Sequence, residues 1–115
     1  MIVKDILPIV EGRALTGEAA LDREVKCGYS CDLLSWVMAH GSESMAWVTV
    51  QTHMNVIAVA TLHDMSCVII PEGAQADEDV VAKAAEEGIA IIASDLPAYE
   101  ISGKLYAAGI GASAE

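Results

Sequence analysis

Four short apolar runs, each followed by a polar turn and a helix-like segment, most restrict how this chain can fold. The runs cover residues 25–29, 46–50, 67–70 and 89–93. Their apolar residues are nearly continuous rather than alternating, which is typical of strands that are buried on both faces. Strands that alternate with helices through short connections favour a mostly parallel sheet with helices on both sides.

A helix is expected after each of these runs. The expected helices cover residues 32–40, 55–62, 78–87 and 98–108. Gly88 and Gly109 follow two of them and are suited to end a helix in the left-handed conformation. In the first helix the apolar spacing predicts one buried face. That face consists of Leu33, Leu34, Val37 and Met38.

We expect a single domain with the α/β architecture. The chain has 115 residues, a length that suits one domain with one core. Before the first run, residues 3–10 predict a short helix and residues 14–16 a short strand. The expected fold is three-layer α/β/α with a mostly parallel sheet of about four to five strands. The domain should cover residues 1–110, with a frayed tail over residues 111–115.

The charge of the chain argues against two classes of partner. There are 17 acidic and 6 basic residues, a formal net charge of −11, and no Lys or Arg lies between Cys27 and Ala82. Clustered Lys and Arg bind nucleic-acid phosphates and anionic membrane surfaces. We therefore expect neither nucleic acid nor a membrane as a partner.

The uncharged run over residues 44–63 has the length of a membrane span. Polar side chains lie in its middle, however, and burying them in lipid would be costly. These side chains are Gln51, Thr52, His53 and Asn55. The run therefore predicts a strand, a loop and a helix. No signal peptide is visible at the start, so the cytoplasm is the expected location.

The three cysteines, Cys27, Cys31 and Cys67, do not predict a disulfide framework, because their number is odd. A metal or iron–sulfur site could combine them with His53 or His63, but their spacing is looser than in usual structural zinc sites. Cys67 lies in an apolar run and resembles a small core residue. We expect no metal and no cofactor.

Polar side chains follow the predicted strands where the four connections should meet. In open parallel sheets ligands bind beyond the carboxyl ends of the strands, next to helix ends with unpaired amides. The candidate ligand-binding residues are Ser30, Asp32, Gln51, Thr52, His53, Asn55 and Ser94. The alternative is that such side chains only cap helices. His53 could also sense pH, or only donate to a backbone carbonyl.

Five segments, in this order and spacing, resemble the DRTGG domain family in its small stand-alone form. They are residues 21–25, 47–53 with Asn55, 71–73, 87–92 and 99–106. The resemblance extends over about three-quarters of the chain. It departs from the family pattern after the second predicted strand. There the chain has Val50-Gln51-Thr52-His53, where the family often has Thr-Gly-Gly-like residues.

The resemblance implies the fold of the N-terminal domain of HPr kinase/phosphorylase. It also implies a regulatory or dimerisation role, since such domains occur next to CBS domains in some pyrophosphatases. It implies no reaction. Stand-alone members are often labelled HPr serine kinases, but such a kinase needs a Gly-rich loop ending in Gly-Lys-Ser/Thr. Neither Gly103-Lys104 nor residues 17–26 have that spacing.

We therefore expect a non-catalytic regulatory, ligand-sensing or protein-docking module. It should act as a homodimer on a metabolic enzyme or signalling protein and bind a small polar or nucleotide-like ligand. Two alternatives stay open. One is a purely structural assembly subunit without a small ligand. The other is a small enzyme that uses His53 or Cys31, whose place at a helix start can activate a thiol.

Overall fold

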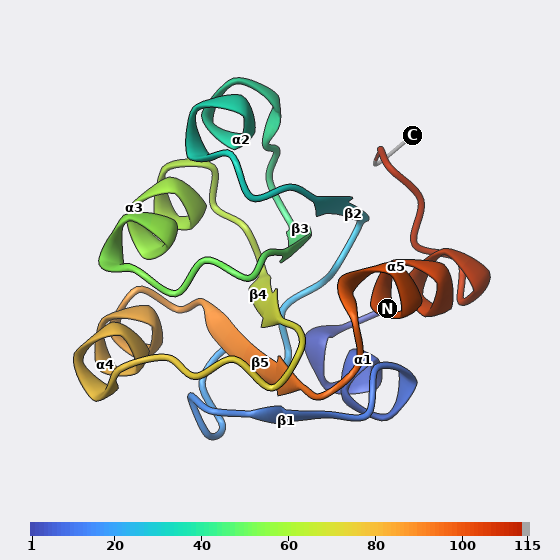
Figure 1. Ribbon diagram of the computed structural model, residues 1–115, viewed down its shortest axis with the longest axis horizontal. Helices are drawn as coiled ribbons and strands as arrows, with labels where there is room; N and C mark the ends of the chain where they lie inside the picture. The colour runs from blue at the N-terminus through green and yellow to red at the C-terminus, as the bar shows by residue number, and fades with distance from the viewer. Residues whose placement is uncertain (114–115) are drawn as a thin grey trace.

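The computed structural model describes residues 1–113, which form one five-stranded mixed sheet and five helices (Figure 1). The strands are β1 (Gly12–Ala14), β2 (Cys27–Ser30), β3 (Met45–Val48), β4 (Cys67–Ile70) and β5 (Ala90–Ser94). The helices are α1 (Val3–Ile9), α2 (Leu34–His40), α3 (Met54–Leu62), α4 (Glu78–Glu86) and α5 (Ala98–Ala107). The expected α/β fold is confirmed.

The sheet has the strand order β1-β5-β4-β3-β2, so β1 and β2 form its edges. Strands β2 to β5 pair in parallel, and only β1 pairs antiparallel, with Gly12 opposite Ser94. Because the parallel strands lie side by side in chain order, α2, α3 and α4 all cover the same face. Figure 1 shows these three helices on one side of the sheet and α1 and α5 on the other.

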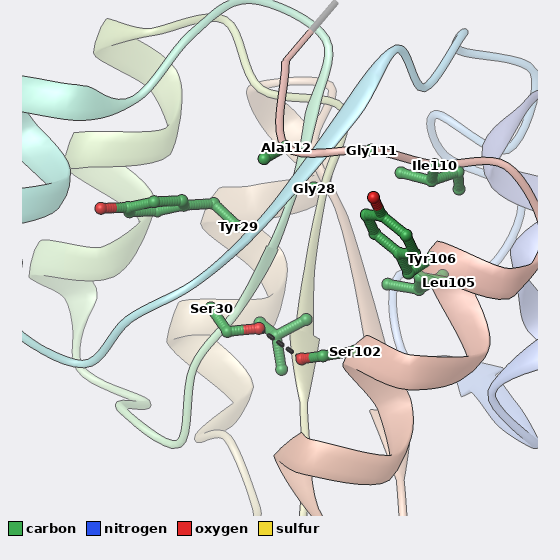
Figure 2. A pocket seen from close by; sticks show the side chains of 10 residues that line it. Gly28, Tyr29, Ser30, Ser102, Leu105, Tyr106, Ile110, Gly111 and Ala112 are labelled. Atoms are coloured by element: carbon green, nitrogen blue, oxygen red, sulfur yellow. Dashed lines mark hydrogen bonds between the residues drawn. The ribbon is translucent and has the colours of Figure 1, made fainter.

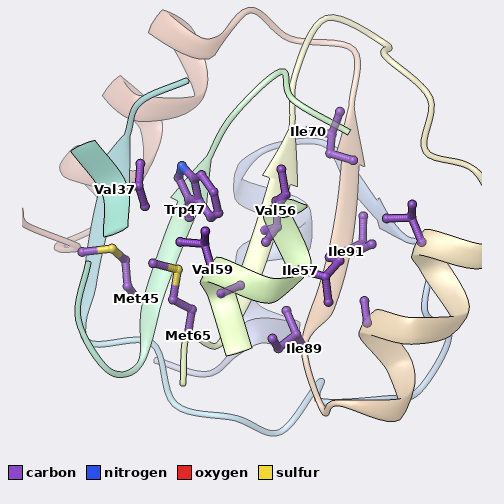
Figure 3. Packing of buried hydrophobic residues seen from close by; sticks show 14 of the residues in the cluster. Val37, Met45, Trp47, Val56, Ile57, Val59, Met65, Ile70, Ile89 and Ile91 are labelled. Atoms are coloured by element: carbon purple, nitrogen blue, oxygen red, sulfur yellow. The ribbon is translucent and has the colours of Figure 1, made fainter. Parts of the chain in front are cut away.

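The first of two apolar cores lies between the sheet and α2, α3 and α4 (Figure 3). Trp47 is the largest fully buried side chain, and its indole Nε1–H donates to the carbonyl oxygen of Cys31 at 2.9 Å. Successive strand residues point to opposite faces. Met45 and Trp47 therefore belong to this core, while Ala46 and Val48 belong to the second.

The second core lies under α1 and α5. Ile6 of α1 and Ile101 and Leu105 of α5 pack there against Val48 and Ile92 of the sheet. Helix α5 reaches this position because the chain crosses to the other face after β5 and returns over β2 and β3. This return brings α5 next to residues near position 30, far from it in the sequence.

The apolar face predicted for the helix after β2, which is α2, is wrong at two positions. Leu33 and Met38 are 62% and 44% exposed, and Val37 is the fully buried residue of α2. The reason is that α2 lies at the sheet edge formed by β2 and packs sideways against α3. Only a narrow line of its residues therefore reaches the sheet.

The loops after β4 and β5 lead to opposite faces of the sheet, and they are tied together where they part. The Glu72 amide donates to the Leu96 carbonyl oxygen at 2.9 Å, and the Gly73 amide donates to that of Ser94 at 3.0 Å. A crevice at the carboxyl ends of parallel strands is expected at such a reversal. The two backbone hydrogen bonds fix the loop after β4 against the loop after β5.

Residues 44–63 form β3, a loop and α3, as expected, and no helix within residues 1–113 is long and apolar enough to cross a membrane. Gly88 and Gly109 have φ angles of 73° and 103°, as expected for residues that end helices. In the expected tail, the carbonyl oxygen of Gly111 accepts a hydrogen bond from the Gly28 amide at 2.8 Å. The last two tail positions, 114 and 115, lie outside the described residues.

Candidate ligand-binding site

A hollow of about 300 Å³ opens at the carboxyl ends of the parallel strands. Residues from the loops after β2, β3, β4 and β5 all contribute to it. They are Asp32, Val50, Pro71, Glu72, Pro97 and Ala98. The hollow thus lies at the end of the sheet where ligands bind in open parallel folds. One of the candidate residues from the sequence, Asp32, lines it directly.

The carboxylate of Asp32 is held in one orientation. Its Oδ1 atom accepts hydrogen bonds from the Thr49 hydroxyl at 2.8 Å and from the Val50 amide at 2.9 Å. The side-chain amide of Gln51 donates to the Asp32 carbonyl oxygen at 3.1 Å. Within residues 1–113, Asp32 Oδ2 accepts no hydrogen bond, and the residue is exposed. One carboxylate oxygen is therefore used by the protein and the other is available.

Helix capping does not account for the candidate residues in the described structure. The N-cap residues of α2, α3, α4 and α5 are Leu33, His53, Asp77 and Pro97, and none of them makes a side-chain capping bond. Asp32 immediately precedes α2, yet its carboxylate reaches across to the end of β3 instead. The Oδ1 atom of this carboxylate therefore pairs polar groups at the end of β3 instead of capping α2.

The other candidate residues do not all gather at the hollow. Thr52 is half-buried and His53 is exposed in the loop after β3, while Asn55 lines a groove between α2 and α3. Ser94 is fully buried, donates to the Val10 carbonyl oxygen at 2.7 Å and accepts from the Leu96 amide at 3.2 Å. The structure thus brings Asp32 and Gln51 together and places the others elsewhere.

Ser30 belongs to a second pocket, of about 200 Å³, between β2, α5 and residues 110–112 (Figure 2). Its hydroxyl lies 2.6 Å from the hydroxyl of Ser102 on α5. Figure 2 shows this pair at one end of the pocket and Tyr106 and Ile110 at the other. The backbone of Tyr29 lines the pocket, but its ring points away toward α2.

Sequence reasoning missed Ser102 and Tyr106, because ligand residues were expected only at the strand ends. A signal was available, since Ala98, Ser102 and Tyr106 are spaced four residues apart and must share one side of a helix. Helix α5 lies alongside β2 and runs in the opposite direction to it. Asp32 and Ala98 line the hollow at the strand ends, and Gly28 and Tyr106 line the pocket of Figure 2.

A third depression, the α2–α3 groove, has a volume of about 420 Å³. It is lined by Leu34, Ser35, Met38, Asn55, Ala58 and Val59. Three large apolar side chains are exposed on these elements: Leu33 just before α2, Trp36 in α2 and Leu62 in α3. The Trp36 indole N–H donates to the Tyr29 hydroxyl at 2.6 Å, so this exposed ring is held at the sheet edge.

The three cysteines are free thiols, and Cys67 lies in the second core, whereas Cys27 and Cys31 lie in or against the first. Cys27 Sγ is 3.4 Å from Ser42 Oγ, and Cys31 Sγ is 3.8 Å from the carbonyl oxygen of Leu33. Burial raises the pKa of the Cys67 thiol to about 12, although the charge of Arg23 partly opposes this. In the part of the chain that the structure describes, no three His, Cys, Asp or Glu side chains converge as metal ligands.

Among solved structures, the fold is similar to the crystal structure of the CBS and DRTGG domains of the regulatory region of Clostridium perfringens pyrophosphatase, complexed with the activator diadenosine tetraphosphate. The superposition has a TM-score of 0.69 and 12% sequence identity and covers 90% of this chain. It covers 45% of the pyrophosphatase chain, so this chain spans less than half of that length. The likeness shows a DRTGG-like fold. No protein-family model and no curated protein matches the sequence.

Proposed function

We propose that this protein is a non-catalytic regulatory module that senses a small polar, nucleotide-like ligand. The observation that carries this proposal is the Asp32 carboxylate, which is oriented by two hydrogen bonds and has one oxygen available beside the hollow at the strand ends. The fold supports the proposal, because the similar pyrophosphatase structure is a regulatory region complexed with an activator.

The chemistry of the hollow indicates which part of a ligand contacts Asp32. Both Asp32 and Glu72 line it, and no Lys or Arg lies between Cys27 and Ala82 in the sequence. Ionised carboxylates only accept hydrogen bonds. A ligand therefore presents hydroxyl or amino groups to Asp32, and a nucleotide-like ligand places its ribose hydroxyls there rather than its phosphates.

The α2–α3 groove supports a docking role. Soluble monomers rarely expose large contiguous apolar patches, and such patches mark interaction sites. Leu34 and Met38 of α2 face Ala58 and Val59 of α3 in this groove. We propose that a second copy of the chain packs against this groove, and that the resulting dimer acts on a metabolic enzyme or signalling protein.

The two alternatives receive less support. For the small-enzyme alternative, the Cys31 thiol contacts the Leu33 carbonyl oxygen, and within the described residues no hydrogen bond joins it to His53. The structural-subunit alternative accounts for Asp32 Oδ1, which pairs the Thr49 hydroxyl and the Val50 amide, but gives no role to the Oδ2 atom beside the hollow. Binding measurements separate this alternative from the proposed sensor.

Native mass spectrometry of freshly purified protein tests the proposal directly. We expect a dimer and extra mass from a retained or added ligand, with nucleosides and nucleotides as the first compounds to add. Asp32→Asn keeps the Oδ1 acceptor for Thr49 and Val50 but removes the charge and the second carboxylate oxygen. This variant should dimerise normally and bind the ligand at least tenfold more weakly.

Glu43→Gln is the matched control, because Glu43 is an exposed carboxylate in the loop before β3, at the opposite end of the sheet. It should bind the ligand as the unchanged protein does. A dimer that gains no mass from the compounds, or an Asp32→Asn variant that binds them with unchanged affinity, would contradict the sensor proposal and favour the structural subunit.

A further inference from the structure

The pocket between β2, α5 and residues 110–112 has walls that are fixed before any ligand arrives. The Gly28 amide donates to the Gly111 carbonyl oxygen at 2.8 Å, and the Ile110 amide donates to that of Leu105 at 3.0 Å. These two bonds hold the segment after α5 against the sheet edge. Preformed sites bind with a smaller entropic cost than sites that must be ordered.

The hydroxyl pair at one end of the pocket offers acceptors rather than donors. Ser102 donates its only proton to the carbonyl oxygen of Ala98 at 2.8 Å. Ser30 Oγ lies 2.6 Å from Ser102 Oγ, so Ser30 must be the donor in that pair. Both hydroxyl protons are therefore used within the protein, and Ser30 presents lone pairs to a ligand.

The rest of the pocket is apolar and has an aromatic side chain at its rim. Val48, Leu105 and Ile110 line it, and the Tyr106 side chain is 73% exposed beside them (Figure 2). An exposed aromatic ring can stack on another flat ring. No charged residue lines the pocket, and the chain carries a net charge of −11, which disfavours anions.

The size of the pocket limits the ligand further. Pockets for drug-sized molecules have volumes of about 300–1,000 Å³. A volume of about 200 Å³ fits a smaller molecule, such as a single ring system. From the acceptor pair, the apolar walls, the exposed ring and this size, we infer that the pocket binds a flat, neutral heterocycle that carries N–H donors, of the nucleobase type.

This inference goes beyond the proposed function, because the pocket is built from other residues than the hollow beside Asp32. The probe is adenine, which has N–H donors and no ribose or phosphate. Adenine titrated into ¹⁵N-labelled protein should shift the backbone amide signals of Gly28, Ser30 and Gly111 with a dissociation constant in the millimolar range or tighter. Benzoate, a flat anion without N–H donors, should bind at least tenfold more weakly.

Two substitutions test the assignment. A Cβ atom at Gly28 would lie 3.4 Å from Ile110 Cγ2 and 3.7 Å from the Ala46 carbonyl oxygen, which are ordinary contact distances. The Cβ atom of Gly28→Val is therefore accommodated in the strand, its two methyl groups extend beyond it into the pocket, and adenine binding should weaken at least tenfold. Gly103→Ala is the matched control on α5, since a Cβ atom added there would meet no atom within 4 Å outside the helix backbone. It should bind adenine normally.

Ser102→Ala changes the polarity of the pocket. Without Ser102 Oγ, the Ser30 proton loses its acceptor and can point to a ligand. Adenine binding should weaken and benzoate binding should strengthen.

The inference is overturned if adenine leaves the three amide signals unchanged, if Gly28→Val binds adenine as tightly as the unchanged protein, or if benzoate binds that protein as well as adenine does. Asp32→Asn should still bind adenine, because Asp32 does not line this pocket. Failure of the proposed function at the hollow and failure of adenine binding in this pocket are therefore two separate results.

Discussion

The guanidinium group of Arg23 donates to the carbonyl oxygen of Gly88 at 3.1 Å, across 65 positions of the sequence. The nitrogen that makes this bond, Nη1, also donates to the Met65 carbonyl oxygen at 2.9 Å. The other terminal nitrogen, Nη2, donates to both the carbonyl oxygen and the carboxylate of Asp64 at 3.0 Å. One side chain thus joins the segment before β2 to the loops that precede β4 and β5.

Arg23→Ala should lower the free energy of unfolding by about 2–3 kcal/mol, because the part-buried carbonyl groups of Met65 and Gly88 lose a charged donor. Arg23→Lys should recover little of this, since an ammonium group cannot reproduce the planar fork of donors. Asp64→Asn should cost less than about 1 kcal/mol, because that half of the ion pair is exposed. Urea denaturation followed by circular dichroism measures all three. Equal losses for Arg23→Ala and Asp64→Asn would contradict this account.

Ser94→Ala should destabilise the protein by about 1–3 kcal/mol, because the buried Val10 carbonyl oxygen and the Leu96 amide each lose a partner. Ser113→Ala, at an exposed position after α5, should change the stability by less than about 0.5 kcal/mol. Thermal denaturation gives both values. Ligand affinity of the folded Ser94→Ala protein should stay near that of the unchanged protein. A large loss of affinity with unchanged stability would instead assign Ser94 to the ligand.

Alkaline pH should destabilise the fold through Cys67. Burial raises the pKa of this thiol from 9.0 to about 12 in the folded protein. Above pH 9 the unfolded thiol loses its proton while the folded one keeps it, so the contribution to stability falls as pH rises toward 12. The slope should reach at most about 1.4 kcal/mol per pH unit. Cys67→Ala should show a shallower decline between about pH 9 and 11 in denaturant titrations, and parallel curves would contradict the prediction.

The two tryptophans should contribute very differently to stability. Trp47 is fully buried and donates to the Cys31 carbonyl oxygen, while Trp36 is 51% exposed. Trp47→Phe should cost about 2–3 kcal/mol through lost packing and an unpaired carbonyl oxygen. Trp36→Phe should cost less than about 1 kcal/mol. Chemical denaturation measures both. The remaining tryptophan should be shielded from iodide quenching in Trp36→Phe and exposed to it in Trp47→Phe.

Most of the architecture could be predicted from local patterns. The run over residues 67–70 is β4, and the segments over residues 78–87 and 98–108 are α4 and α5 to within one residue. Apolar runs and helical spacing are properties of neighbouring residues, so they can be read without knowing the fold. The burial of α2 could not be predicted in this way, because it depends on the position of α2 at the sheet edge.

The candidate site could be predicted only in part. Asp32 lines a hollow at the strand ends, where polar residues after parallel strands were expected. The sequence also suggested Ser94, but its hydroxyl bonds to Val10, which precedes β1 in the chain. Nothing in the local sequence shows that the N-terminal segment lies beside β5, because β1 joins the sheet through a long-range antiparallel pairing.

The layers of this protein follow from its amino-acid sequence alone, because continuous apolar strands with short helical connections have few other ways to bury their surface. Which polar groups meet depends instead on the tertiary structure. Ser30 and Ser102 lie 72 positions apart and come together because α5 crosses to the opposite face and returns over β2. That path is set by the packing of Ile101 and Leu105 on the sheet, and packing between distant segments leaves no local pattern in the chain.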